Sequence, residues 1–537
     1  MKQVLKIPLY NKFYYDFLAQ DKKVLKYLPG LDKINWQEEC DKIKDISGIH
    51  KDIKKVLIEQ NKDLTSPPAQ ENLNKLANTN STIIFTGQQL GILASPLYTV
   101  YKAITTIKLA NTLNKQRSKC YFIPVFWLET NDHDFQEVNR LGIWDKNLTP
   151  LTLMYNGKER SKTSIHHYRL EKVIINLLSD LHRNLIDTEF TDQLFTIIQS
   201  IYKEGTDWLD STRNFLKFLF QDFGLLYFNP ADVKVKKLSL RFYVKYLENI
   251  EQIRTEFSDV SSALLKDGYK NQIKNIAGKT FIHIENEALQ REHLYYKDKK
   301  FYREKLGRKF TLKEIKDFIC NNPESFSPGV VSRPLLQSWL LPTVAYVAGP
   351  AEITYWAQLK NLFDKMEIKM PVIFPRISAT IIEPKIARFI RNHKINLEDI
   401  NLRYNDIIKT YYRSFLKLPY SKRFVYLKSV IEKEFKKINQ MFDQLDPTLQ
   451  PVSVKAYNRI INQIENLENK TIHALELKEK TVTGHLKQIY NAIFPYNQPQ
   501  ERFISICYFL NKFGIELIPG LINELKIDEF NHQIVGL

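Results

Sequence analysis

Short apolar runs that alternate with longer stretches of helical periodicity dominate the first 390 residues of the chain. Runs rich in β-branched and aromatic residues predict buried strands at 83–85, 121–127, 225–228, 344–348 and 371–374. The segments between them repeat apolar residues every three or four positions, as in 96–110. Strands that alternate with helices predict an α/β fold, here a doubly wound parallel sheet.

Two regions depart from this alternation. Residues 280–285 and 293–296 alternate apolar and polar positions with a period of two, which predicts a small antiparallel hairpin module inserted into the core. Further on, apolar residues from Phe424 to Leu445 recur at spacings of three and four, and a break at 446–451 precedes a second helical stretch at about 453–493. Two long helices joined by a short connection predict an antiparallel coiled-coil hairpin.

These patterns divide the chain into six segments. We expect an N-terminal helical segment joining the core at 1–80, the first part of the core at 81–234 and an inserted subdomain with the hairpin at 235–330. The second part of the core follows at 331–390, the coiled-coil hairpin at 391–493 and a helical tail that packs on the core at 494–537.

Composition and charge exclude several classes of protein. The 78 Lys and Arg against 60 Asp and Glu give a net charge of +18, but the lysines are spread along the chain, so we expect no nucleic-acid partner. No run approaches the ~18 apolar residues of a membrane-spanning helix, and the N-terminus lacks the apolar region of a secretory signal. The four cysteines are far apart. We therefore expect a cytoplasmic protein without membrane contact or a disulfide framework.

The loop after the first predicted strand contains two closely spaced glycines, Gly87 and Gly91, in a chain with only 17 glycines in 537 residues. A strand, a glycine loop and a helix in that order leave free backbone N–H groups that suit an anion or a nucleotide. The loop does not match the standard phosphate-binding motifs, and the alternative is that both glycines only permit a tight turn. Nearby, Gln88 and Gln89 are candidate ligand contacts, and Lys102 is either a phosphate ligand or a solvated lysine.

His133 follows the second predicted strand and is flanked by Asp132 and Asp134. A carboxylate beside an imidazole orients the ring, so His133 is the candidate general base and the two acids support it. The alternative is a helix-capping aspartate next to a surface histidine. One histidine with acids is weak evidence for a metal, and His166 and His167 are interpreted as an exposed loop pair, so no metal site is expected.

Polar residues also follow the other predicted strands. Gly349 and Glu352 open the helix after the fourth strand, where Glu352 either contacts a substrate or only stabilises the helix dipole. The remaining binding candidates beside strand-end loops, of which the arginines suit carboxylates, are Asn229, Arg333, Arg376 and Ser378.

Several long strings together resemble one family, the cysteine ligases of bacillithiol biosynthesis, called the BshC family. The strings are TGQQLGILASPLYTVYKAITTIKLA, IPVFWLETNDHDFQEVN, SRPLLQSWLLPTVAYVAGPAEITYWAQLK, MPVIFPRISATIIEPK and FPYNQPQERF. They cover essentially the whole chain in the expected order. Two departures are Ala351, where the family pattern has glycine, and the string from Glu129 to Asp132.

The resemblance implies a Rossmann-like core related to class I aminoacyl-tRNA synthetases, with inserted connecting subdomains, and a coiled coil that forms a homodimer. It also implies an amide-forming reaction between two small-molecule substrates, L-cysteine and glucosaminyl-malate. A free carboxylate needs activation, so ATP or another adenine nucleotide is expected, and Arg333 and Arg376 are candidates for the malate carboxylates. The alternative hypothesis is a synthetase-like RNA- or nucleotide-binding protein without ligase activity.

Overall fold

A computed structural model describes the chain except residues 1, 6–8, 33, 46–47, 79, 117–118, 304–307, 398–403, 405–407, 409–410 and 413–418. It divides into two compact units. Residues 8–379 and 501–533 form one, which we call the core unit. Residues 1–7, 380–500 and 534–537 form the other, which we call the coiled-coil unit. No helix among the described residues combines the length and apolar character needed to cross a membrane.

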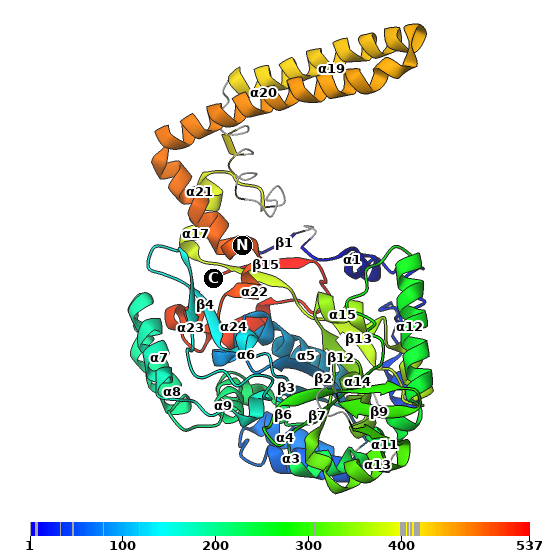
Figure 1. The fold of residues 1–537 in the computed structure, drawn as a ribbon. Coiled ribbons are helices and arrows are strands. Elements are labelled where there is room, and N and C mark those ends of the chain that lie inside the picture. The colour runs from blue at the N-terminus through cyan, green and yellow to red at the C-terminus, as the bar shows by residue number, and fades with distance from the viewer. Residues whose placement is uncertain are drawn as a thin grey trace. The chain divides into compact units, whose positions relative to one another are not determined.

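A five-stranded parallel sheet organises the core unit (Figure 1). Its strands lie in the order β13, β12, β2, β3, β6, with bounds Val372–Pro375, Thr343–Ala348, Ser81–Gln89, Tyr121–Glu129 and Leu226–Phe228. Among the strands of this sheet, β2 comes first in the sequence and lies at the centre, and later strands are added outward on both sides of it. The strands are almost wholly buried because both faces are covered. The predicted doubly wound sheet is confirmed.

Helices cover the sheet and make up much of the rest of the core unit. Helix α5, Tyr98–Asn114, contacts both β2 and β3, and its residues are mostly buried. The other helices before the inserted sheet are α1 Lys12–Leu18, α2 Trp36–Asp41, α3 His50–Gln60, α4 Pro67–Asn78, α6 Phe135–Val138, α7 Val173–Asn184, α8 Thr191–Ile201, α9 Trp208–Phe220, α10 Val233–Leu238, α11 Leu240–Glu248 and α12 Ile250–Lys266. Those after it are α13 Leu312–Asn321, α14 Ser332–Leu340, α15 Pro350–Trp356, α16 Lys360–Lys365, α22 Gln500–Phe503, α23 Ile506–Phe513 and α24 Leu517–Glu524.

The predicted hairpin module is confirmed and is larger than expected. Strands β7 Lys279–Glu285, β8 Arg291–Lys297 and β9 Lys300–Arg303 form an antiparallel meander, and β10 Lys309–Phe310 and β11 Phe326–Pro328 extend it on either side. A further hairpin, β4 Arg140–Trp144 with β5 Pro150–Met154, follows α6.

The coiled-coil unit contains the predicted antiparallel helices, α19 Pro419–Leu445 and α20 Gln450–Lys478, joined by a short 3-10 turn. It also holds α17 Pro384–Asn392 and most of a three-stranded sheet of β1 Lys2–Leu5, β15 His532–Gly536 and β14 Ala379–Ile382. Part of the predicted segment 391–493 lies outside the described residues.

Two predictions from periodicity are wrong in detail. The helix predicted at about 453–493 is divided into two helices, α20 and α21. Glu479 leaves the helical conformation, and α21 Lys480–Ile493 begins after it. The following Thr-Val-Thr-Gly sequence has low helix propensity, which favours a break there. The strand β1 lies in the N-terminal segment that was predicted to be helical, since a lone edge strand gives little periodic signal.

Gly91 is required by a close approach of the backbone. A Cβ built on Gly91 would lie 2.0 Å from the carbonyl oxygen of Ser95, whereas one on Gly87 would lie 3.1 Å from the Cβ of Trp127. The tight turn Ile92–Ala94 that follows β2 therefore depends on the missing side chain at Gly91. The turn interpretation accounts for Gly91, and Gly87 remains a candidate for ligand contact.

We expect Gly91→Ala to lower the free energy of unfolding of the core unit by about 1–3 kcal/mol, because a backbone atom must move to admit the methyl group. The control is Gly520→Ala in α24, where a Cβ meets nothing within 4 Å. That change should raise stability by roughly 1 kcal/mol through helix propensity. Chemical denaturation measures both, and equal effects of the two variants would contradict the steric explanation.

Candidate functional site

A pocket of about 680 Å³ opens at the carboxyl ends of β2 and β12. The strand order reverses between these two neighbouring strands, which is where doubly wound sheets bind ligands. The lining includes both strand ends, the inserted sheet and the C-terminal tail, in particular Gly87, Gln88, Gln89, Tyr98, Lys102, Glu129, Asp132, Lys274, His283, Arg291, His293, Arg333, Gly349, Ala351, Glu352, Arg376 and Arg502. The pocket therefore brings together most of the residues that the sequence singled out.

A buried ion pair joins the two sides of the strand reversal. The Nζ of Lys102 lies 2.5 Å from the Oε2 of Glu352 and donates to the carbonyl oxygen of Gly87 at 2.7 Å and to the Oε1 of Gln88 at 3.0 Å. Burial lowers the pKa of Lys102, although the charge of Glu352 opposes this shift. Burial alone would raise the pKa of Glu352, but the interactions with Lys102 act in the opposite direction and the pKa of Glu352 is lowered. The lowered pKa keeps Glu352 ionised at neutral pH. The alternative of a solvated Lys102 is wrong, because its side chain is 3% exposed.

Glu352 also closes the start of α15. Its Oε2 accepts the backbone N–H of Gly349 at 2.8 Å, and its Oε1 accepts the hydroxyl of Tyr346 at 2.7 Å. The carboxylate thus caps the helix as well as lying in its first turn, where the sequence suggested stabilisation of the helix dipole, and it also fixes the position of Lys102.

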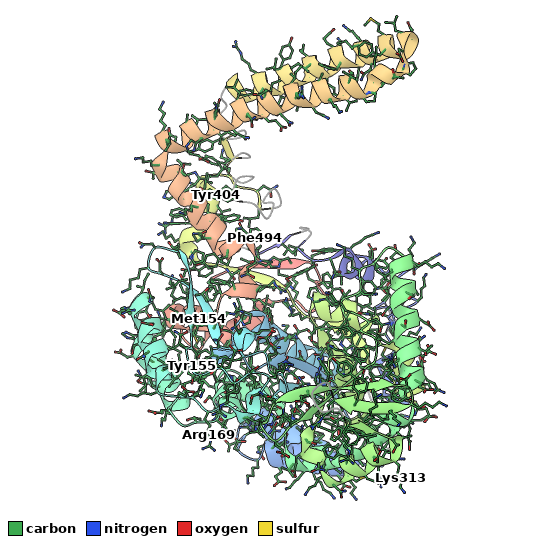
Figure 2. All side chains as sticks on the ribbon, viewed as in Figure 1. Met154, Tyr155, Arg169, Lys313, Tyr404 and Phe494 are labelled. Atoms are coloured by element: carbon green, nitrogen blue, oxygen red, sulfur yellow. The ribbon has the colours of Figure 1, made fainter. Side chains whose placement is uncertain are left out.

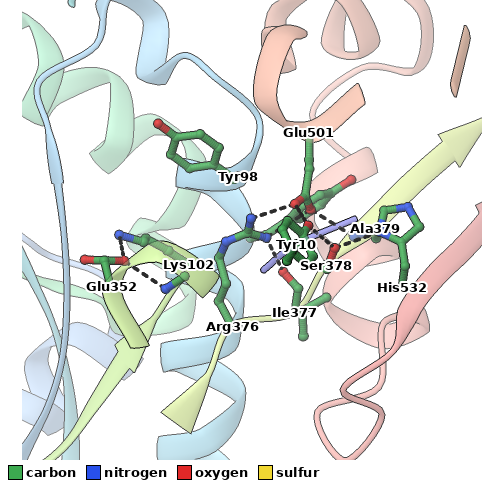
Figure 3. Close-up of polar contacts among 12 residues, drawn as sticks. Tyr10, Tyr98, Lys102, Glu352, Arg376, Ile377, Ser378, Ala379, Glu501 and His532 are labelled. Atoms are coloured by element: carbon green, nitrogen blue, oxygen red, sulfur yellow. Dashed lines mark hydrogen bonds and ion pairs between the residues drawn. The ribbon is translucent and has the colours of Figure 1, made fainter. Parts of the chain in front are cut away.

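Arg376 forms a second buried ion pair, with Glu501 of the C-terminal tail (Figure 3). Its Nη atoms donate to the two carboxylate oxygens at 2.6 and 2.9 Å, and the Tyr10 hydroxyl donates to the same carboxylate at 2.5 Å. Burial raises the pKa of Glu501, but Arg376 outweighs burial and lowers that pKa to about 2. Ser378 does not line the pocket and instead bonds to Tyr10 and to the Nδ1 of His532 at 2.8 and 2.7 Å.

One donor of Arg376 is left for a ligand. Among the described residues its buried Nε has no hydrogen-bond partner, and a Cβ on Gly349 would lie 3.4 Å from that atom. The missing side chain at Gly349 therefore keeps space open beside an unused cationic donor. The ring of Tyr98 lies between two guanidinium groups, 5.4 Å from that of Arg376 and 5.9 Å from that of Arg502. This corner fits an anionic group, either a phosphate or a carboxylate.

Asp132 and His133 follow β3, and Asp132 lines the pocket. Asp132 accepts hydrogen bonds from the Nε2 of Gln89 at 2.5 Å and from the backbone N–H of His133 at 2.7 Å, and its Oδ1 is 3.7 Å from the Nδ1 of His133. Arg291 of the inserted sheet is 3.8 Å from the same oxygen. Burial and then Arg291 lower the pKa of His133, so the ring is neutral at neutral pH and can accept a proton.

The family models decide which family this chain represents. The model described as "Bacillithiol biosynthesis BshC, N-terminal Rossmann-like domain" matches residues 1–377, and the model for the C-terminal coiled-coil domain of BshC matches residues 379–537. The chain belongs to the BshC family. A relative from Desulforamulus reducens is 29% identical over 86% of this chain and 85% of its own, and one from Bacillus licheniformis is 27% identical over 99% of both. Both carry the name "Putative cysteine ligase BshC".

Several candidates in this BshC chain lie away from the pocket lining. His133 itself is not a lining residue, although its neighbours Asp132, Arg291 and His283 are. Asp134 caps α6 by accepting the N–H of Glu137 at 3.2 Å. Asn229 accepts the N–H of Ala231 at 2.9 Å and, like Gly91, does not line the pocket.

Sequence reasoning missed the contribution of the inserted sheet to the BshC pocket. His283 on β7 lies opposite His293 on β8 in the strand register, their rings are 4.2 Å apart, and Arg291 is two residues before His293. The Nδ1 atoms of both histidines have no hydrogen-bond partner among the described residues. The signal was present as polar residues at a spacing of two on one strand face, but the hairpin pattern alone did not reveal that this face meets the main sheet.

A second missed feature is the surroundings of His166 and His167, which are half-buried and not exposed as expected. They form a short 3-10 turn, Ile165–His167, that contacts α9. Trp208 of α9 packs edge-on against Tyr155, which Figure 2 labels, in an aromatic cluster. The indole N–H of Trp208 donates to the carbonyl oxygen of Leu90 at 2.7 Å. The cluster therefore connects this turn to the loop after β2.

We expect Glu501→Gln to lower the free energy of unfolding at neutral pH by about 3–5 kcal/mol, because Arg376 keeps a buried charge without its counter-ion. The depressed pKa of Glu501 stabilises the folded state above about pH 4.5, and that contribution is lost as the pH falls toward about 2. The stability difference between wild type and variant should therefore shrink over this range. Urea denaturation at several pH values measures it.

The matched control is Asp180→Asn, which removes the exposed i,i+3 pair of Asp180 with Arg183 on α7. Its effect should stay below about 0.5 kcal/mol. A similar loss in both variants, or a difference for Glu501→Gln that does not change with pH, would contradict the assignment.

Proposed function

We propose that this chain is a cysteine ligase that joins the carboxylate of L-cysteine to the amine of glucosaminyl-malate as an amide. Membership of the BshC family and the name that its relatives carry support this reaction class. The observation that carries the proposal is the pocket at the strand reversal, where charged groups of both signs converge from separate elements. Both substrates carry carboxylates and an amine, so a site lined by both cations and anions suits them.

The cationic corner would hold the carboxylates of the malate group. Arg376 offers its unused Nε, and Arg502 lies at the exposed rim beside Tyr98. Arg333 lies deeper, where its Nη2 donates to the Tyr355 hydroxyl at 2.6 Å and its Nε is 3.4 Å from the Oε2 of Glu129. Two separate cationic groups match the two carboxylates of malate better than one.

His133 would accept the proton that the attacking amine loses. The ring is neutral because burial and Arg291 lower its pKa, and the carboxylate of Asp132 lies 3.7 Å from its Nδ1. Below the lowered pKa the ring is protonated and can no longer act as a base.

ATP or another adenine nucleotide would supply the free energy that activates the cysteine carboxylate. The strand ends of a doubly wound sheet are the usual place for a nucleotide, and this pocket lies at such strand ends. Gly87, Gln88 and Gln89 line the same pocket, and Lys102 holds Gly87 and Gln88 in position.

The purified chain, incubated with L-cysteine, glucosaminyl-malate and ATP, should form the amide product, detected by mass spectrometry. His133→Gln should lower kcat about 10²–10⁴-fold and remove the acid limb of the pH–rate profile, because the variant has no base to protonate. Omitting ATP, or replacing it with other nucleotides, identifies the activating cosubstrate.

The control is His182→Gln, an exposed histidine on α7 of the same unit, which should keep the wild-type rate. A folded wild-type protein that forms no amide with any nucleotide would refute the ligase proposal. Full activity with an unchanged pH profile in His133→Gln would refute only the role of His133.

We also propose that the coiled-coil unit forms a homodimer. Apolar side chains on α19 and α20 remain exposed, among them Val425, Leu445, Ile460 and Leu467. Sedimentation velocity should give a dimer for the wild type and a monomer for Leu467→Glu, whereas Asn466→Glu, an exposed neighbour, should remain dimeric. A monomeric wild type would exclude the dimer.

A further inference from the structure

His166, His167 and Glu285 form a cluster outside the pocket. One possible ligand atom from each lies within 4.8 Å of the other two, and the Nε2 of His167 is 3.0 Å from the Oε2 of Glu285. The two imidazole rings are adjacent, with centroids 3.9 Å apart. The histidines come from the turn Ile165–His167, and Glu285 is the last residue of β7, so the cluster joins segments more than a hundred residues apart.

Neighbouring groups hold the potential ligand atoms in place. The Nδ1 of His166 lies 3.0 Å from the carbonyl oxygen of Thr130, so it carries the proton in that contact and the Nε2 presents a lone pair. Among the described residues, that Nε2 has no hydrogen-bond partner. The hydroxyl of Ser164 donates to the Oε1 of Glu285 at 2.6 Å and leaves Oε2 directed at His167. Outer contacts of this kind orient the ligands in metal sites.

We propose that His166, His167 and Glu285 bind a divalent transition-metal ion, with Zn²⁺ as the preferred ion. Two imidazoles and one carboxylate are a common ligand set for zinc, and water would complete a tetrahedral shell. The ion would replace the hydrogen bond between His167 and Glu285, and the proton on Nε2 of the neutral His167 ring would move through solvent to Nδ1, so that Nε2 presents its lone pair to the ion. This inference is independent of the proposed ligase reaction and departs from the absence of a metal site expected from the sequence.

Two buried cations, the ammonium group of Lys236 and the guanidinium group of Arg291, interact electrostatically with Glu285, and Lys236 makes the following hydrogen bonds. Its Nζ donates to the Oδ1 of Asn131 at 3.1 Å and to the carbonyl oxygen of Phe326 at 2.7 Å. Both carboxylate oxygens of Glu285 are held by other partners, Ser164 and His167. Lys236 therefore makes no hydrogen bond to the Oε2 of Glu285, and an ion would have to replace only the contact with His167.

The ion would act by positioning one wall of the pocket. The backbone N–H groups of Ile165 and His166 donate to the carbonyl oxygens of Asp132 and Thr130 at 2.8 and 3.2 Å. Fastening the turn Ile165–His167 to β7 thus fixes the segment after β3 that carries Asp132. The ligands lie outside the pocket lining, so the ion is assigned no contact with the reacting groups.

The test uses the full chain, freed of any affinity tag and treated with EDTA. Titration calorimetry with Zn²⁺ should show about one equivalent bound per chain. Co²⁺ should give the visible absorption bands of a tetrahedral site. His167→Gln and Glu285→Gln should each weaken Zn²⁺ binding by at least about 100-fold, and Ser164→Ala by about 10–100-fold.

His182→Gln is the matched control and should bind Zn²⁺ like the wild type. The thermal midpoint of the wild type should rise with Zn²⁺, and that of Glu285→Gln should not, which separates metal binding from a loss of folding. Absence of stoichiometric Zn²⁺ binding by the folded wild type, or equal binding by Glu285→Gln, would overturn the proposal and leave His167 and Glu285 as an ion pair only.

Discussion

The buried pair of Lys102 and Glu352 is the contact on which the pocket depends. It connects the helix after the first strand of the sheet with the helix after the fourth, across the point where the strand order reverses. Two charges at this depth are tolerated only because hydrogen bonds satisfy them, and here Gly87, Gln88, Gly349 and Tyr346 supply those bonds. The same contacts that neutralise the pair also determine where the two strand-end loops lie.

Most cations of the pocket already have a partner within the chain. Lys102 directs its ammonium at three acceptors, and the two Nη atoms of Arg376 are used by Glu501. Among the described residues of the pocket, the Nε of Arg376 is a buried cationic donor without a hydrogen-bond partner. A ligand that matches this donor gains a charged hydrogen bond without displacing an existing pair, whereas a ligand that needs Lys102 must compete with Glu352.

The parts of the site that lie on the parallel strands were predictable from the sequence. Apolar runs locate such strands, and since parallel strands end at one edge, residues such as Gly87 and Glu352 must lie near one another. The contributions of Arg291 and His293 were not predictable, because local periodicity describes a hairpin but not the surface on which it packs. Glu501 and Glu285 were missed for a related reason: their partners, Arg376 and His167, lie more than a hundred residues away.

The position of Glu501 has a consequence for how the molecule is made. A ribosome releases the chain from its N-terminus, so the whole parallel sheet and the long helices emerge before Glu501 does. Until then Arg376 has no counter-ion, and Arg502, which contributes to the rim beside Tyr98, is also missing. The pocket is thus completed only after the segment with Glu501 and Arg502 has been translated, and a chain that terminates before this segment cannot form the finished site.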